Sequence, residues 1–436
     1  MADTPVRIAL WGYGSFGKNT SESMKQYWGG AYIVTKIYDI EKRGRDPWWG
    51  IEISDPDSIA EDYLAGVFEK VIICIQNLWI SGRIKKGLKT QGIPWFCPGK
   101  KDDIVPAEQF EKREDYSFRI KGNDYSFFWL KNMRGAVSDH DGSELMHLFN
   151  EEGLIPKESV QQFNSWEPDR SVMIPFRLKH ATPERVKMDG AFCVLARLYS
   201  HNYWHFTFQN ADCVSLLEDA GYQGKYIIAG TESNRALMHL LGVGDERIIN
   251  INDLENHKVY EFDELALLCF NGIEHDHSLA AIADISRKVK KQLVRRENAP
   301  KKLYVKRIGV RRLLNGDEIA KKLGFEIFVP EEHSVKEQAE AFYNADIVLT
   351  PHGANSTNCI YMHEGAVFAE IFSTGCYHCV NRHACEHLGI HYLSEIGEPI
   401  TSSKETAVGL SADYTISETK IIKMVEKAEK LLCPVE

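Results

Sequence analysis

The chain has 436 residues, a formal net charge of −10 at pH 7 and a hydrophobic fraction of 44%. Its length is enough for two or three domains, and its composition is that of a globular protein, which excludes a disordered or repeat-built chain. The acidic balance argues against non-specific binding to nucleic acid or to anionic membranes.

The first hundred residues are predicted to form a small α/β module. A strand is expected over residues 6–11, a helix follows to about residue 28, and further strands are expected over residues 32–38 and 71–75. Strands that alternate with helices indicate a parallel sheet with right-handed crossovers. Residues 1–100 are therefore predicted to be a Rossmann-like module.

The turn after the first strand carries a glycine-rich pattern, Gly12-x-Gly14-x-x-Gly17, and Asp39 ends the second strand. Between a strand and a helix this pattern is typical of a dinucleotide site, where the glycines let the backbone approach a pyrophosphate and the acid binds a ribose. The module is short, however, and aromatic side chains crowd the turn. The sequence therefore favours a structural or interaction role over bound NAD(P), with these four residues as the cofactor contacts if one binds.

Residues 101–159 are predicted to be a linker with one or two packing helices. Within them, Asp139-His140-Asp141 imitates the Asp-x-Asp motif of metal-dependent transferases, but it is interpreted as a turn before a helix, where aspartates are common. A second α/β domain is expected over residues 160–298. It is predicted to hold a helix at 199–217, a strand at 226–229 and a basic helix at 279–296.

Residues 299–436 show the clearest pattern and are predicted to be a third α/β domain. Asn315 with Glu318, and Ser334 with Glu337, have the spacing of helix capping boxes. The arrangement favours two adjacent Rossmann-type domains with a cleft between them. Strands are expected over residues 303–305, 325–329, 347–350 and 366–372, with a last helix at 417–432.

Polar side chains follow two of these strands. Arg307 and Arg311 come after the strand at 303, and His352 comes after the strand at 347, with Ser356 as a predicted helix N-cap. Ligands of open parallel sheets bind beyond the carboxyl ends of the strands, where a helix N-terminus and arginine forks favour an anion. The pattern therefore predicts a diphosphate site, although an ordinary basic loop beside a capped helix accounts for it equally well.

The stretch YVKRIGVRRLLNG has an arginine followed by a second arginine four residues on, and a Pro-His-Gly-Ala motif and an EIF strand follow it. In this order the motifs resemble those of glycosyltransferase family 61, over residues of about 160–395. Upstream, SHNYWHFTFQNADCVSLLEDAG resembles the family's Asn-Tyr-Tyr-His-Trp helix. The likeness covers more than half of the chain.

The resemblance implies a GT-B-like fold, inversion at the anomeric carbon and a nucleotide-sugar donor, usually a UDP-sugar. Carried over by position, Arg307 and Arg311 would hold the diphosphate, and Glu370 would bind the ribose hydroxyls. His205 would lie in the cleft as the general base for the acceptor hydroxyl, a role that inverting transfer requires. The segment after the strand at 347 would complete the donor site with His352, Gly353, Ser356, Thr357 and Asn358.

The sequence departs from the family pattern in three places. Lys306 replaces a serine before Arg307, and Asn355-Ser356 replaces a Gly-Leu pair. Gln209 replaces an aspartate four residues after His205. The third departure leaves the identity of the base open, and a core or capping histidine is an equally good interpretation of His205.

No metal site is predicted. His201 and His205 have the spacing of a zinc-binding pair, but no third ligand follows them. A later segment is rich in cysteine and histidine, yet its spacing fits no zinc pattern. Its members are interpreted as core thiols and surface imidazoles: Cys376, His378, Cys379, His383, Cys385, His387 and His391.

The sequence as a whole predicts an inverting glycosyltransferase with a nucleotide-sugar donor and a glycan or glycolipid acceptor, in a setting such as bacterial surface-polysaccharide assembly. It is expected to need no cofactor and to bind no nucleic acid. No segment has the pattern of a signal peptide or the roughly 18 to 20 apolar residues of a membrane span, so a cytoplasmic location is expected, with peripheral membrane association and oligomeric state left open. The alternatives are an NAD(P)-dependent oxidoreductase that uses the N-terminal glycines, and a nucleotide-sugar-binding protein without catalysis.

Overall fold

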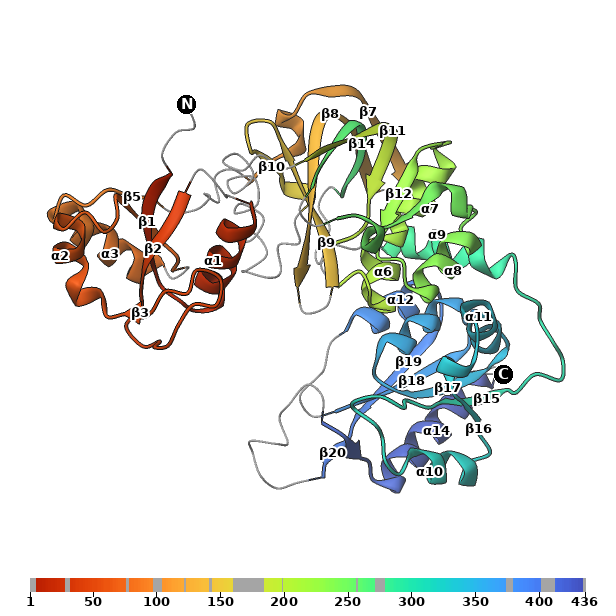
Figure 1. Ribbon diagram of the computed structural model, residues 1–436. Coiled ribbons are helices and arrows are strands. Elements are labelled where there is room, and N and C mark those ends of the chain that lie inside the picture. The colour runs from red at the N-terminus through yellow and green to blue at the C-terminus, as the bar shows by residue number, and fades with distance from the viewer. Residues whose placement is uncertain are drawn as a thin grey trace. The chain divides into compact units, whose positions relative to one another are not determined.

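A computed structural model shows a mixed α/β protein with several parallel sheets, which confirms the α/β class of the predicted fold (Figure 1). The GT-B-like pair of Rossmann-type domains and the Rossmann-like module stay predictions. The chain packs as two compact units, and their boundaries do not follow the domain boundaries expected from the sequence. The first unit comprises Met1–Tyr116, Phe127–Leu198 and Ile251–Cys269, and the second comprises Ser117–Ser126, Tyr199–Asn250 and Phe270–Glu436. The structure describes residues 5–27, 32–75, 78–96, 104–120, 123–140, 143–159, 184–197, 199–255, 258–270, 279–373, 379–400 and 412–433.

The first unit begins with a parallel sheet in the order β3-β2-β1-β4-β5 (Figure 1). Side chains of β1 alternate between its two faces, so that Ile8 and Leu10 enter one core and Ala9 enters the other. The strand order reverses between β1 and β4, which is where open α/β sheets bind ligands. The strands are β1 (Val6–Trp11), β2 (Tyr32–Tyr38), β3 (Ile53–Ser54), β4 (Lys70–Ile73) and β5 (Trp95–Phe96), and the helices are α1 (Ser15–Tyr27), α2 (Ile59–Leu64) and α3 (Leu78–Thr90).

The glycine-rich turn of this module packs tightly at two of its three glycines. An ideal Cβ on Gly17 would lie 1.9 Å from the carbonyl oxygen of Gly12, and Gly12 has a φ of +100°. Nothing lies within 4 Å of an ideal Cβ on Gly14. Gly12 and Gly17 are therefore required by the contact between the turn and the first turn of α1.

Asp39 closes the same turn from the end of β2. Its carboxylate accepts the N–H of Tyr13 at 2.5 Å and the N–H groups of Glu41 and Lys42 at 2.8 Å each. Burial acts to raise the pKa of Asp39, but these backbone hydrogen bonds outweigh it and hold the pKa below its usual value. The carboxylate that would meet a ribose is thus engaged with the protein's own backbone. The favoured structural or interaction role of this module stays a prediction.

The prediction of a helical linker over residues 101–159 is wrong, because the segment is built mainly of strands. Its longest strand, β8, pairs in antiparallel fashion with β9, from Met133 opposite Asn150 to His140 opposite Ser143. Asp139 and His140 therefore end a strand rather than precede a helix, and Asp141 lies outside the described residues. The strands are β6 (Ile104–Val105), β7 (Lys112–Ile120), β8 (Asn123–His140), β9 (Ser143–Asn150) and β10 (Ile155–Pro156).

The first unit also holds a parallel pair of long strands, β11 (Arg185–Val194) and β14 (Val259–Phe270), that the sequence did not predict. Glu261 of β14 pairs with Arg134 at 3.2 Å and with Arg185 at 2.9 Å. Short 3-10 turns complete this unit: η1 (Pro56–Ser58), η3 (Ala107–Gln109), η4 (Lys157–Ser159) and η6 (Ile251–Asp253).

The second unit opens with two short helices where one was expected. Asn202 caps α6 by accepting the N–H of Trp204 at 2.9 Å, and Asn210, with a φ of −137°, separates α6 from α7. The later basic helix ends at Lys290, earlier than expected. The elements are α6 (Tyr203–Gln209), α7 (Ala211–Asp219), β12 (Lys225–Ile228), α8 (Glu232–Leu240), η5 (Asp245–Arg247), β13 (Ile248–Asn250) and α9 (Leu279–Lys290).

A five-stranded parallel sheet, in the order β16-β15-β17-β18-β19, forms the rest of the second unit. Figure 1 shows α10 and α14 on one side of this sheet and α11 and α12 on the other. The strands are β15 (Lys302–Val305), β16 (Glu326–Phe328), β17 (Ile347–Pro351), β18 (Val367–Phe372) and β19 (His391–Ile396), followed by the pair β20 (Glu398–Pro399) and β21 (Tyr414–Thr415). The helices are α10 (Gly316–Lys322), η8 (Pro330–Glu332), α11 (Val335–Asn344), η9 (Ala354–Tyr361), α12 (Val380–His387) and α14 (Glu418–Leu432).

One of the two predicted capping boxes in this sheet domain is present. The Ser334 hydroxyl accepts the N–H of Glu337, and the Glu337 carboxylate accepts the N–H of Ser334. The prediction for Asn315 is wrong, because its side chain caps no helix and instead hydrogen-bonds the backbone of Ile416 in both directions. A spacing rule found both candidates, and tertiary contacts decided between them.

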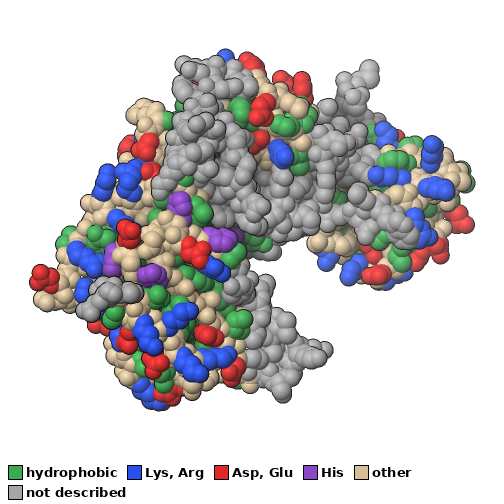
Figure 2. Space-filling model, turned by 180° about the vertical axis from the view of Figure 1, so that it is seen from behind, with side chains coloured by type: hydrophobic (Ala, Val, Ile, Leu, Met, Phe, Trp, Pro, Cys, Tyr) green, Lys and Arg blue, Asp and Glu red, His purple; other side chains and the backbone are tan. Residues whose placement is uncertain are grey.

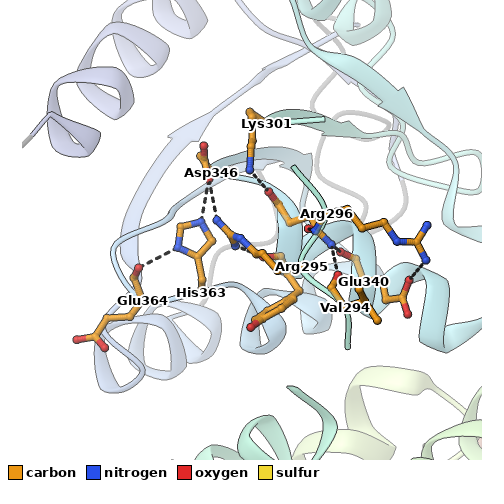
Figure 3. Close-up of polar contacts among 10 residues, drawn as sticks. Val294, Arg295, Arg296, Lys301, Glu340, Asp346, His363 and Glu364 are labelled. Atoms are coloured by element: carbon orange, nitrogen blue, oxygen red, sulfur yellow. Dashed lines mark hydrogen bonds and ion pairs between the residues drawn. The ribbon is translucent and has the colours of Figure 1, made fainter. Parts of the chain in front are cut away.

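Two arginines of the segment between α9 and β15 have acidic partners within the second unit. Figure 3 shows Arg295 meeting Asp346, which also contacts His363, and Arg296 meeting Glu340. In the view of Figure 2, basic side chains are interspersed with acidic ones over the described surface. Within the described part of the chain, no helix is long and apolar enough to cross a membrane.

We expect Gly17→Ala to lower the stability of the N-terminal module by about 1 to 3 kcal/mol, the usual cost of overpacking. The added methyl would meet the carbonyl oxygen of Gly12. Gly14→Ala is the matched control, since its added methyl has open space. Chemical unfolding of the two variants measures the difference, and equal stability would contradict the close packing of this turn.

Candidate functional site

The loops after β15 and β17 meet at the carboxyl edge of the second unit's sheet. β15 and β17 are neighbouring parallel strands, and the strand order of the sheet reverses between them. The Arg307 guanidinium donates from Nη1 to the carbonyl oxygen of His352 at 3.3 Å and from Nε to the carbonyl oxygen of Val310. An ideal Cβ on Gly353 would lie 1.5 Å from Arg307 Nη1, so only glycine lets the guanidinium lie where it does.

Arg311 lies in the same neighbourhood as Arg307. Burial raises the pKa of Tyr414 well above its usual range, while the positive charges of Arg307 and Arg311 both act in the opposite direction. Tyr414 itself donates its hydroxyl to the carbonyl oxygen of Ile371 at 2.7 Å, so it lies beside the end of β18. Arg311 has a φ of 62°, an uncommon value for a residue with a side chain.

The two other cations of this loop have acidic partners. Lys306 pairs with Asp317 at 2.6 Å, and Arg312 pairs with Asp413 at 2.5 Å. Their charges are therefore balanced by neighbouring carboxylates. The lysine that replaces the family's usual serine thus pairs with Asp317 in the first turn of α10.

His352 is held by a buried carboxylate. Its Nδ1 lies 2.7 Å from Oε1 of Glu370, and its ring stacks on Phe372 with centroids 4.7 Å apart. His352 is 7% exposed and Glu370 is 0% exposed. Alternation along β18 explains this position, because Ala369 and Ile371 enter the apolar core on the α10 and α14 side while Glu370 points to the opposite face.

Glu370 has further donors around its carboxylate. Oε1 accepts the side-chain N–H of Asn381 at 2.9 Å, and Oε2 accepts the hydroxyl of Tyr392 at 2.8 Å. Burial acts to raise the pKa of Glu370, but the hydrogen bonds from His352, Tyr392 and Ser356 outweigh it and lower the pKa below its usual value.

The expected contact between Glu370 and a ribose is therefore corrected. The carboxylate is fully buried, and its two oxygens already accept side-chain donors. A ribose hydroxyl needs an accessible oxygen. Glu370 belongs to the support of the site rather than to its ligand-facing surface.

Asn381 connects this support to α6. The indole N–H of Trp204 lies 3.3 Å from the Oδ1 atom of Asn381. The hydroxyl of Tyr203 lies 3.2 Å from Oδ1 of Asn358 in η9. Two adjacent residues of α6 thus contact the segments around the carboxyl edge of the sheet.

His205 follows them on α6 and is partly exposed. Its Nδ1 lies 2.7 Å from Oε1 of Gln209, and its ring packs edge-on against Trp204 with centroids 4.9 Å apart. An amide oxygen accepts only, so Nδ1 carries the proton and Gln209 orients the ring. His201 precedes the Asn202 cap and therefore does not share a helix face with His205.

The expected helix N-terminus at Ser356 is wrong. The segment after Gly353 is a 3-10 helix, η9, that begins at Ala354, and Ser356 is its third residue. The Ser356 hydroxyl instead accepts the N–H of Gly353 at 3.3 Å. Ser356, Thr357 and Asn358 are all 0% exposed, so they lie in the interior rather than on a ligand-facing surface.

No group of three or more metal-ligating side chains occurs among the described residues. Within the cysteine- and histidine-rich segment, Cys376 and His378 lie outside the described residues. The remaining members are spread over α12 and its two flanks, where Cys385 is buried and His383 and His391 are exposed.

Sequence reasoning missed three members of the support, Trp204, Asn381 and Tyr392. A signal was present, since a glutamate in the middle of the apolar strand VFAEIF must meet donors when it is buried. Which donors those are depends on α6, α12 and β19, which lie far from Glu370 in sequence.

Comparison with known proteins identifies the region that carries this site. Residues 169–369 match the family described as glycosyltransferase 61. The alpha-1,3-arabinosyltransferase XAT3 of Oryza sativa subsp. japonica is 30% identical over 103 residues, which are 21% of this chain and 18% of the relative. The match thus spans less than a fifth of that relative's length.

Among solved structures, a mutant of the flavo di-iron protein from Thermotoga maritima aligns with 86% of this chain and 85% of its own, at 10% identity. Its TM-score is 0.23, which is too low to indicate a shared fold. The family match, by contrast, includes α6, β15, β17 and η9, and it ends one residue before Glu370. The chain therefore contains a glycosyltransferase domain of family 61.

Proposed function

We propose that the protein is an inverting glycosyltransferase that binds the diphosphate of a nucleotide-sugar, most simply a UDP-sugar, between the loop of Arg307 and the loop of His352. The observation that carries the proposal is the junction of these loops at the point where the sheet reverses its strand order, the usual ligand position in open α/β sheets. A glycan or glycolipid is the proposed acceptor, and bacterial surface-polysaccharide assembly in the cytoplasm is the proposed setting.

The chemistry needs a stabilised leaving group and a base. Arg307 and Arg311 are suited to the negative charge that develops on the departing diphosphate, because guanidinium groups donate to phosphate in bidentate fashion. These groups perform the task that a divalent ion performs in other transferases, so we propose that no metal is required. His205, oriented by Gln209, is the proposed base for the acceptor hydroxyl.

A thermal-shift screen against UDP-, GDP- and CMP-sugars tests the proposal, since a ligand that binds the native state raises the melting temperature by mass action. Each ligand is tested with and without excess EDTA, and the best donor is then used in a transfer assay. The proposal fails if no nucleotide-sugar shifts the melting temperature, and its metal-independent part fails if EDTA abolishes transfer and manganese restores it.

Arg307→Ala and Arg311→Ala should each weaken nucleoside diphosphate binding roughly 10- to 100-fold, because a charge-assisted hydrogen bond contributes about 1.5 to 3 kcal/mol and about 1.4 kcal/mol is tenfold. The double variant should lose less than the sum of the two single losses, since both groups act on one ligand. Calorimetry with UDP measures these losses. Arg382→Ala, which removes an exposed cation of α12, is the control, and wild-type affinity in both Arg307 and Arg311 variants would place the donor site elsewhere.

Gly353→Ala should weaken UDP binding by about tenfold or more while the protein stays folded. The added methyl would displace the Arg307 guanidinium, which is the flexible end of a side chain and can move away. Gly309→Ala, in the same loop, is the matched control because nothing lies within 4 Å of its ideal Cβ. Calorimetry together with melting temperatures distinguishes the outcomes, and equal UDP affinity in the two variants would show that the Arg307 position is immaterial.

His205→Ala should lower kcat by about 100-fold or more, the usual scale for loss of a general base, with little change in nucleotide affinity. His201→Ala is the control, because it removes an exposed histidine just outside the same helix. Steady-state kinetics with the identified donor measures both. A loss of only a few fold for His205→Ala would return this residue to a structural role.

A further inference from the structure

The hydrogen bonds around Glu370 have a direction that the chemistry of the side chains sets. The indole N–H of Trp204 can only donate, so the amide oxygen of Asn381 faces it. The amide N–H of Asn381 then faces Glu370 Oε1 at 2.9 Å. Oε1 therefore accepts the hydrogen bond from Asn381, and its hydrogen bond with His352 must have the same direction.

The same oxygen lies 2.7 Å from Nδ1 of His352. Since Oε1 accepts, Nδ1 of His352 must carry a proton and donate it. The second ring nitrogen, Nε2, lies on the side of the ring away from Glu370. A histidine whose Nδ1–H is held by a buried carboxylate has a fixed ring orientation and is a stronger base at Nε2.

The charges around His352 divide into two groups. From β18 the ionised Glu370 favours a positive charge on the ring, since opposite charges within about 4 Å favour the charged form. From the loop after β15, Arg307 and Arg311 oppose it. Tyr392 of β19, Tyr414 of β21 and Asn381 of α12 are neutral donors. A bound diphosphate would add negative charge on the side of the arginines.

We infer that Glu370 is a positioning residue, which holds the ring of His352 in place and keeps it protonated at both nitrogens while a nucleoside diphosphate is bound. This inference rests on the proposed donor site. His352 then contacts the diphosphate as a positively charged imidazolium. Its Nε2 proton lies between the ring and the phosphate oxygens. The protein therefore binds the nucleotide more tightly at low pH, and the affinity falls as the pH rises and His352 loses a proton.

Calorimetry of UDP and GDP binding from pH 6.5 to 9.5, with wild type and Glu370→Gln, tests the inference. Wild-type affinity should fall about tenfold per pH unit once His352 titrates, because one proton is linked to binding. In Glu370→Gln the fall should begin about one pH unit lower or more, since the opposite charge is lost. The ligand's own phosphate titration is common to both proteins and cancels in the comparison.

Glu386→Gln, which removes an exposed carboxylate of α12, is the matched control and should follow wild type. Parallel pH profiles for Glu370→Gln and wild type would overturn the inference, while a loss of affinity in Arg307→Ala would leave the donor site standing. Absence of binding by any nucleotide in wild type would instead remove the proposed function and this inference with it.

A second measurement needs no variant at this buried position and applies if Glu370→Gln does not fold. Wild-type binding enthalpies in two buffers of different ionisation enthalpy report proton uptake. Uptake should approach one proton per nucleotide in the pH range where affinity falls. No uptake anywhere between pH 7.5 and 9.5, where the phosphate itself no longer titrates, would overturn the inference.

Discussion

The hydrogen bond between His352 and the buried carboxylate of Glu370 is the interaction on which this part of the structure depends. A fully buried carboxylate is costly unless donors surround it, and here the donors come from the loop after β17, from α12 and from β19. The requirement therefore determines how these elements pack against β18. It also places the ring of His352 at the carboxyl edge of the sheet, where the loop of Arg307 arrives.

At the same edge, the Arg307 guanidinium lies close to the backbone of Gly353. Gly353 has no side chain, and Arg307 lies in the space where one would be. Two loops that are 45 residues apart in sequence, those of Arg307 and His352, are thereby joined by a side-chain-to-backbone hydrogen bond. Most of the neighbouring basic residues, by contrast, meet carboxylates, as Arg295 and Arg296 do (Figure 3). The basic run in the sequence is thus largely a set of intramolecular ion pairs.

The N-terminal module presents a similar contrast between pattern and use. Its glycine-rich turn and Asp39 have the spacing of a dinucleotide site, yet the acid binds the backbone of the turn itself. Two of the glycines are explained by the packing of α1 against the turn. A motif that is shared with cofactor-binding proteins can therefore be maintained by packing alone, since tight strand–helix junctions need the same residue types.

The sequence by itself determined several strands of the parallel sheets, because buried strands such as β17 and β18 are short apolar runs bounded by helix caps and glycines. It also located the arginine and Pro-His-Gly motifs at strand ends. It failed over residues 101–159, where long strands were taken for a linker with packing helices, and it missed β3, β5, β11, β13, β14 and β19.

The roles of Glu370, Ser356 and Asn315 were decided only by the tertiary structure. Their side chains have several hydrogen-bonding options of similar strength, and the partner is chosen by whichever element packs nearby. Asn315 bonds to the backbone of Ile416, about a hundred residues away, and Glu370 bonds to α12 and β19. Local patterns fix where a strand ends, but the contacts of a buried polar side chain depend on residues that only the folded chain brings to it.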